Sequence, residues 1–177
     1  MKIWVSSLAK VHDTARSARP ARVVSLLGPD SLFPDIEGFG ADLHYRVCLD
    51  DDRKEIDGRV TPTQDHVAGV VSFLQEWNPD DTLLVHCWAG ISRSSATAFI
   101  AACLHNPEAD ETAIAEEIKL ASPTAYPNTR IVAFADEIMG RGGRMAEAAI
   151  EICNCPERTT RAYAVGEAEP FSIRARY

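Results

Sequence analysis

Short apolar segments alternate with longer segments of helical periodicity along this chain. Residues 3–8, 22–27 and about 44–49 have the length and composition of β-strands, and Gly28-Pro29 closes the second of them. Residues 82–86 form a short continuous apolar run, which is typical of a strand buried on both faces of a parallel sheet. The pattern therefore predicts four strands in the first half of the chain.

Helical spacing follows several of these strands. Thr61-Pro62 opens a segment whose apolar residues recur at helical intervals until Asn78-Pro79-Asp80 ends it. Further helices are predicted directly after residue 95, near 110–121, near 128–139 and near 144–153. Alternating strands and helices favour an α/β fold, with a central, mostly parallel sheet flanked by helices.

Length and composition indicate one domain. The chain has 177 residues, of which 46% are hydrophobic, and this is enough for a full core. We found no long linker or repeat and assign residues 1–177 to a single domain. Residues 156–177 are expected to form a C-terminal arm or an edge strand, with Phe171-Ser172-Ile173 as the candidate strand.

Charge and cysteine content indicate which classes of partner are disfavoured and which cellular compartment to expect. The net charge of −8 disfavours nucleic acid and anionic membrane surfaces as partners. No apolar run approaches the roughly 18 residues of a membrane span, and the first apolar segment is too short for a signal peptide. The five cysteines are an odd number, so we interpret them as reduced thiols and expect a cytoplasmic protein.

The most informative segment is His86-Cys87-Trp88-Ala89-Gly90-Ile91-Ser92-Arg93-Ser94-Ser95, which we call the signature loop. It joins a predicted strand to a predicted helix, the geometry in which backbone N–H groups and a helix N-terminus bind anions. Gly90 permits a turn that a Cβ would obstruct. Arg93 offers a planar fork to two oxygens of an oxyanion, and the same field favours the thiolate of Cys87. This pattern indicates phosphoryl chemistry through a cysteine nucleophile.

The signature loop resembles that of the cysteine-dependent protein tyrosine phosphatases, His-Cys-x5-Arg followed by Ser or Thr, and is most similar to the small bacterial dual-specificity type. The resemblance implies a phosphatase-like α/β fold and a phosphocysteine intermediate formed by Cys87 in a phosphate-binding P-loop. It implies that Arg93 and the amides of Trp88, Ala89, Gly90, Ile91, Ser92 and Arg93 bind the phosphate. It also implies that Ser94 hydrogen-bonds the sulfur and that His86 braces the loop. Neither a metal nor an organic cofactor is implied.

A phosphate ester also needs an acid that protonates its leaving oxygen. In the family that the loop resembles, an aspartate after the preceding strand supplies this proton. Asp50, Asp51 and Asp52 stand at that place, and Asp51 is our choice because of its spacing to Gly58 and Pro62. Asp52 and then Asp57 are the alternatives.

Three further groups of residues carry possible binding or structural roles. Asn128 after Tyr126-Pro127 resembles an element that packs near the active site in dual-specificity phosphatases, although a helix N-cap explains it equally well. Arg141-Gly142-Gly143-Arg144 could bind phosphate, but we favour a helix–helix connection with surface arginines. His12, His44, His66 and His105 are interpreted as ordinary surface or core residues.

The expected activity is hydrolysis of phosphotyrosine, with phosphoserine and phosphothreonine as further candidates, in a phosphorylated protein or a small phosphomonoester. A pseudophosphatase that only binds phosphorylated partners is one alternative. Lipid or inositol phosphate hydrolysis is another, disfavoured because the signature loop has no lysine. Sulfur transfer and arsenate reduction are the least favoured.

Overall fold

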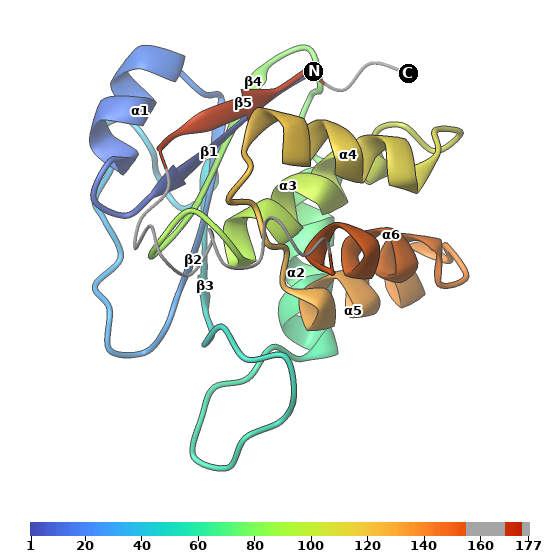
Figure 1. Ribbon diagram of the computed structural model, residues 1–177. Coiled ribbons are helices and arrows are strands. Elements are labelled where there is room, and N and C mark those ends of the chain that lie inside the picture. Colours follow the sequence, from blue (N-terminus) through green and yellow to red (C-terminus); the bar gives the residue numbers. More distant parts are fainter. Residues whose placement is uncertain (155–168, 175–177) are drawn as a thin grey trace.

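The computed structural model describes residues 1–154 and 169–174. Within these ranges, five strands form one sheet in the order β3-β2-β4-β1-β5 (Figure 1). Strands β1 to β4 run parallel to their neighbours, and β5 pairs antiparallel with β1. The strands are β1 (Lys2–Ser7), β2 (Arg22–Leu27), β3 (His44–Cys48), β4 (Thr82–Cys87) and β5 (Phe171–Ile173). The mostly parallel sheet predicted from the sequence is confirmed.

Helices cover both faces of the sheet, as Figure 1 shows. One face packs against α1 and the loop between β2 and β3, around the buried side chains of Val11, Ile36 and Leu84. The large core lies on the other face, beneath the remaining helices. The helices are α1 (Val11–Ala18), α2 (Gln64–Gln75), α3 (Arg93–Leu104), α4 (Glu111–Ala121), α5 (Thr129–Met139) and α6 (Arg144–Cys153).

Helix α3 lies at the centre of the large core. All of its residues except Leu104 are buried, because it packs on the sheet and also contacts α2, α4 and α5. Small residues such as Ala98, Ala101 and Ala102 allow these close approaches. Thr97 lies within this apolar helix, and its hydroxyl donates to the carbonyl of Arg93 at 3.0 Å. A rigid helix therefore begins at the end of the signature loop.

Helix α1 was missed by the sequence pattern. It has eight residues, its N-cap residue Lys10 makes no side-chain capping bond, and only Val11, Thr14 and Ala15 are buried. Such a short apolar stripe falls below what helical periodicity can distinguish from a polar loop. The other helices and strands occur where they were predicted, with ends shifted by a few residues.

Strand β5 lies at the edge of the sheet, where Phe171 pairs with Val5 and Ile173 with Ile3. The rest of the predicted C-terminal arm, residues 156–168 and 175–177, lies outside the described residues. Over residues 1–154 and 169–174, no helix combines the length and the apolar character needed to cross a bilayer.

Candidate active site

Cys87 is the last residue of β4, the strand at the middle of the sheet. In the register of the sheet it pairs with Ser7 of β1 and Leu26 of β2. The chain then turns through the signature loop and enters α3 at Arg93. The site therefore lies at the carboxyl ends of the parallel strands, where ligands bind in open α/β sheets.

Gly90 forms the tightest part of this turn. Its φ is +73°, and a Cβ at this position would lie 2.8 Å from the backbone N of Ser7 and 2.9 Å from the carbonyl carbon of Ser6. Both atoms belong to the backbone of a central strand, so neither can move aside cheaply. A hydrogen bond from the N–H of Leu8 to the carbonyl of Trp88, at 3.1 Å, holds the loop against the end of β1. Only glycine fits the turn as it is built.

Two polar groups converge on the Cys87 sulfur. The backbone N–H of Gly90 donates to Sγ at 3.3 Å, and the hydroxyl of Ser94 lies 3.1 Å from it. Ser94 is fully buried in the first turn of α3. The thiol is only 2% exposed. An N–H dipole and a hydroxyl group are thus both within hydrogen-bond distance of one sulfur.

Arg93 is held at the start of α3. Its Nη1 donates to the carbonyl of Leu49 at 2.8 Å, which links the signature loop to the end of β3. Its Nε is buried and has no hydrogen-bond partner among residues 1–154 and 169–174. Buried guanidinium donors are costly when they are unsatisfied. A tetrahedral oxyanion bound in the loop is the kind of acceptor that this geometry suits.

Asp51 contacts the signature loop directly. Its Oδ1 accepts hydrogen bonds from the Ser92 hydroxyl at 2.8 Å and from the Asn128 side-chain amide at 2.7 Å. Asp50 and Asp52 instead form ion pairs with Arg59, and Asp57 is exposed in the same loop. Of the carboxylates proposed from the sequence, Asp51 is thus the one that is bonded to the loop of Cys87.

Asn128 joins three segments. Its Oδ1 caps α5 by accepting from the N–H groups of Arg130 and Ile131, each at 3.1 Å. Its Nδ2 bonds Asp51, and its backbone N–H donates to the carbonyl of Ser92 at 3.3 Å. The two interpretations of this residue were not alternatives, since one side chain caps the helix and also lies at the site. Phe134, one turn after Arg130 in α5, packs against the Arg130 side chain.

Comparison with solved structures identifies the fold. The PTP-2 phosphatase of Cydia pomonella matches with a TM-score of 0.58 and 22% identity, over 76% of this chain and 84% of that one. Human DUSP28 matches with a TM-score of 0.58 and 17% identity, over 79% and 95% of the two chains. The Yvh1 phosphatase domain of Chaetomium thermophilum matches with a TM-score of 0.59 and 17% identity, over 81% and 93%. This chain has the dual-specificity phosphatase fold. No family model and no curated protein sequence matches it.

Within this phosphatase fold, a buried chain of polar side chains supports the signature loop from below. The Ser25 hydroxyl lies 2.5 Å from Nε2 of His86 and 2.6 Å from Nε2 of His44. Burial lowers the pKa of His86 from 6.5 to about 3 and that of His44 to about 4. Both rings are therefore neutral near neutral pH and act as hydrogen-bonding groups. Sequence reasoning selected His86 but missed Ser25 and His44, because only the order of the strands brings them together.

The exposed part of the loop is apolar. The Trp88 side chain is 52% exposed, whereas Ile91 is buried and packs with Ala89 and Tyr126.

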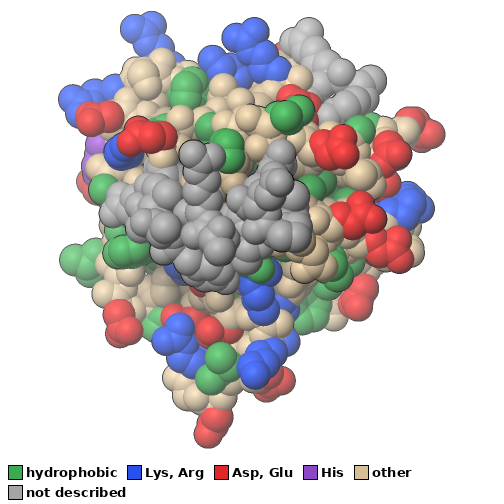
Figure 2. Space-filling model, in the orientation of Figure 1, with side chains coloured by type: hydrophobic (Ala, Val, Ile, Leu, Met, Phe, Trp, Pro, Cys, Tyr) green, Lys and Arg blue, Asp and Glu red, His purple; other side chains and the backbone are tan. Residues whose placement is uncertain are grey.

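The β3–α2 loop, which carries Asp51, projects at the bottom of Figure 1. On the face shown in Figure 2, acidic and basic side chains are interspersed along this projection.

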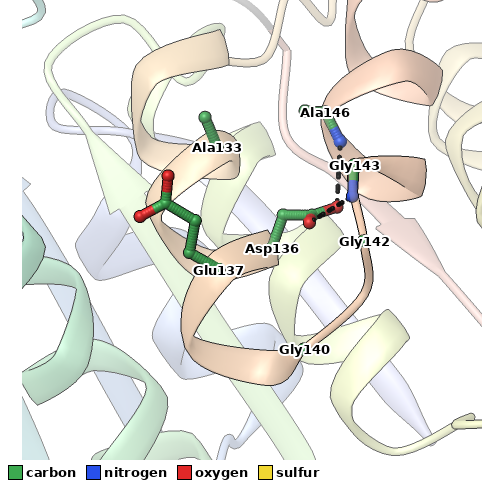
Figure 3. Close-up of a pocket in the computed structure, with 7 residues that line it drawn as sticks. All are labelled: Ala133, Asp136, Glu137, Gly140, Gly142, Gly143 and Ala146. Atoms are coloured by element: carbon green, nitrogen blue, oxygen red, sulfur yellow. Dashed lines mark hydrogen bonds between the residues drawn. The ribbon is translucent and has the colours of Figure 1, made fainter.

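The Arg141–Arg144 turn does not present an anion site. The buried carboxylate of Asp136 already accepts from the N–H groups of Gly143 at 2.6 Å and Ala146 at 3.4 Å (Figure 3). It also accepts from the N–H of Met145 at 2.8 Å. The expectation of surface arginines was wrong for Arg141, which is buried and bonds Glu111 at 3.1 Å. The turn connects α5 to α6, and the Asp136 carboxylate of α5 occupies its N–H groups.

Proposed function

We propose that this chain is a phosphomonoesterase that hydrolyses phosphotyrosine, and also phosphoserine or phosphothreonine, through a phosphocysteine intermediate. One observation carries the proposal: the Cys87 sulfur, the buried Arg93 and the Asp51 carboxylate all connect to one tight loop. Nucleophile, anion-binding group and acid are the three parts that this reaction needs.

In the first step, the Cys87 thiolate attacks phosphorus and a sulfur–phosphorus bond forms. The bond from phosphorus to the ester oxygen breaks, and Asp51 gives its proton to that oxygen as it leaves. Arg93 and the loop amides bind the three equatorial oxygens, where negative charge concentrates in the transition state. The alcohol or phenol departs neutral, and the phosphoryl group stays on sulfur.

In the second step, water attacks phosphorus and the sulfur–phosphorus bond breaks. Asp51, now ionised, accepts a proton from the attacking water. The Ser94 hydroxyl, 3.1 Å from Sγ, donates to the sulfur as it regains its negative charge. Inorganic phosphate and the starting thiolate are the products.

The loop chemistry favours a dianionic monoester over a more highly charged substrate. Arg93 is the one Lys or Arg of the signature loop, so the loop itself carries a single formal positive charge. The exposed Trp88 offers an aromatic surface beside the loop, which suits the ring of phosphotyrosine. These two features support a protein or small aryl phosphate as substrate rather than an inositol phosphate.

The test compares phosphate release from p-nitrophenyl phosphate and a phosphotyrosine peptide by wild type, Cys87→Ser and the matched control Cys48→Ser. Cys48 is an exposed thiol at the end of β3, so its replacement should leave the rate unchanged. We expect Cys87→Ser to abolish turnover, and equal rates for wild type and Cys87→Ser would refute the mechanism. Tight phosphopeptide binding without turnover would indicate a pseudophosphatase, and preferential hydrolysis of phosphoinositide vesicles would indicate a lipid phosphatase.

The role of Asp51 has its own signature. An acid that must carry its proton makes kcat fall on the alkaline side of the pH profile. Asp51→Asn should lower kcat on phosphotyrosine by about 10²- to 10⁴-fold and remove that dependence. The control is Asp57→Asn, an exposed carboxylate in the same loop. If Asp57→Asn removes the dependence and Asp51→Asn keeps it, the assignment moves to Asp57.

A further inference from the structure

Arg53 lies two residues after Asp51 in the β3–α2 loop and reaches back to the body of the protein. Its Nη2 donates to the carbonyl of Tyr126 at 3.3 Å, and its Nη1 lies 3.5 Å from the Thr129 hydroxyl. Its Cζ lies 4.3 Å from the centroid of the Tyr126 ring. The guanidinium is therefore held by its edge and by its face at the same time.

The end of helix α6 also lies beside the Arg53 guanidinium. Burial raises the pKa of the Cys153 thiol at the end of α6, and Arg53 beside it works in the opposite direction. The Arg53 side chain is half-buried. It lies between the loop of Asp51, the turn before α5 and the end of α6. A side chain that meets three segments fixes its own loop relative to the other two.

Tyr126 connects this contact to the signature loop. Its backbone N–H donates to the carbonyl of Ile91 at 3.0 Å, and its ring packs beside Ile91. The contacts from Arg53 through Tyr126 to Ile91 are separate from the hydrogen bond between Asp51 and Ser92. Arg53 therefore links the loop of the proposed acid, through Tyr126, to Ile91, the residue next to Ser92 in the loop that holds Cys87.

We propose that Arg53 is a positioning residue that sets where the Asp51 carboxyl stands relative to the leaving oxygen; the inference rests on the proposed function of Asp51. Arg53 itself need not touch the substrate. Without its contacts, Asp51 keeps its bonds to Ser92 and Asn128, but the loop loses its link through Tyr126 to Ile91. Displacement of about 1 Å in a reacting group can lower a rate about 10²-fold. Lysine cannot replace it, because an ammonium lacks the planar fork and the stacking face.

The experiment uses the dependence of kcat on the leaving group. A phosphotyrosine peptide releases a phenol of pKa about 10 and needs a positioned acid. The compound 6,8-difluoro-4-methylumbelliferyl phosphate releases a strongly acidic phenol that departs as an anion without one. The variants are Arg53→Gln and Arg53→Lys, with Lys54→Gln as the matched control, since Lys54 is an exposed cation one residue further along.

We expect both Arg53 variants to lower kcat on phosphotyrosine by about 10- to 100-fold and on the difluoro substrate by less than about threefold, with Lys54→Gln unchanged on both. In an Asp51→Asn background, Arg53→Gln should then have no further effect, because the acid that it positions is gone.

Equal losses on both substrates, or full additivity with Asp51→Asn, would overturn the inference and indicate general damage to the fold. Wild-type rates for Arg53→Lys would overturn it too, since charge alone would then suffice. Failure of the wild type to hydrolyse either substrate would instead overturn the proposed function, and with it the inference.

Discussion

Acid should destabilise this protein through two buried histidines, His44 and His86, which share the Ser25 hydroxyl. That hydroxyl has one proton to give, so one ring accepts it and the other donates its own Nε2 proton to the serine oxygen. Both hydrogen bonds to the Ser25 hydroxyl can be made while both rings are neutral. The unfolded chain exposes both rings to water, where their pKa returns to about 6.5.

The direction and magnitude of this change in the free energy of unfolding follow from the two pKa values. Burial holds the pKa of His44 at about 4 and that of His86 at about 3, so between these values and 6.5 the unfolded chain binds more protons than the folded one. The free energy of unfolding is therefore greatest above about pH 6.5 and falls as the pH drops toward 4 and then 3. At about pH 5, each buried ring lowers the free energy of unfolding by about 2 kcal/mol, and the two together lower it by about 4 kcal/mol. That is a large part of the 5–15 kcal/mol that stabilises a typical domain.

Urea unfolding at about pH 7.5 and about pH 5 measures this loss in wild type, His44→Gln and the control His12→Gln. His12 is exposed on α1, so its replacement should leave the pH dependence as it is in wild type. His44→Gln removes one of the two titrating rings and should reduce the loss between the two pH values by about 2 kcal/mol. The same loss in His44→Gln as in wild type would refute the reasoning, whatever the stability of the variant at neutral pH.

Three further predictions concern the signature loop. Gly90→Ala should lower the free energy of unfolding by about 2–4 kcal/mol, measured by urea denaturation, because a Cβ would strain a left-handed residue and press on the backbone of β1; wild-type stability would contradict this. Ser94→Ala should slow the second step about 10- to 100-fold, so that a burst of phenol precedes slow turnover in stopped-flow assays; a single-phase time course would contradict this. Trp88→Ala should raise KM for a phosphotyrosine peptide about 3- to 10-fold and leave KM for a phosphoserine peptide unchanged; equal changes for the two peptides would contradict stacking.

Much of the fold could be predicted because its signals are local in the sequence. The continuous apolar run of β4 and the signature loop directly after it are read from neighbouring residues. Strand β2 and helix α5 also carry their own end signals, Gly28-Pro29 after the strand and the Asn128 cap before the helix. Such features need no knowledge of which segments meet in space.

The rest depends on contacts between distant segments. Ser25, His44 and His86 come from three strands that follow the order β3-β2-β4, and no periodicity in the sequence gives that order. The burial of Arg141 likewise depends on Glu111, thirty residues away at the start of α4. A charged residue beside glycines looks exposed until its partner is located.

The choice among three adjacent aspartates shows where local reasoning ends. In extended backbone, side chains two residues apart point to the same side, so Asp50 and Asp52 must face away from Asp51. The structure follows this rule: Asp50 and Asp52 share Arg59, whereas Asp51 binds Ser92 and Arg53 binds the Tyr126 turn on the opposite side. Such alternation is a property of extended backbone and does not tell which side faces the signature loop. That side is set by Arg93, which bonds Leu49, and by Asn128, which bonds Asp51. Asp51 and Arg53 bond to neighbouring parts of the protein, Ser92 and the Tyr126 turn, so one loop can hold both the proposed acid and the residue that positions it.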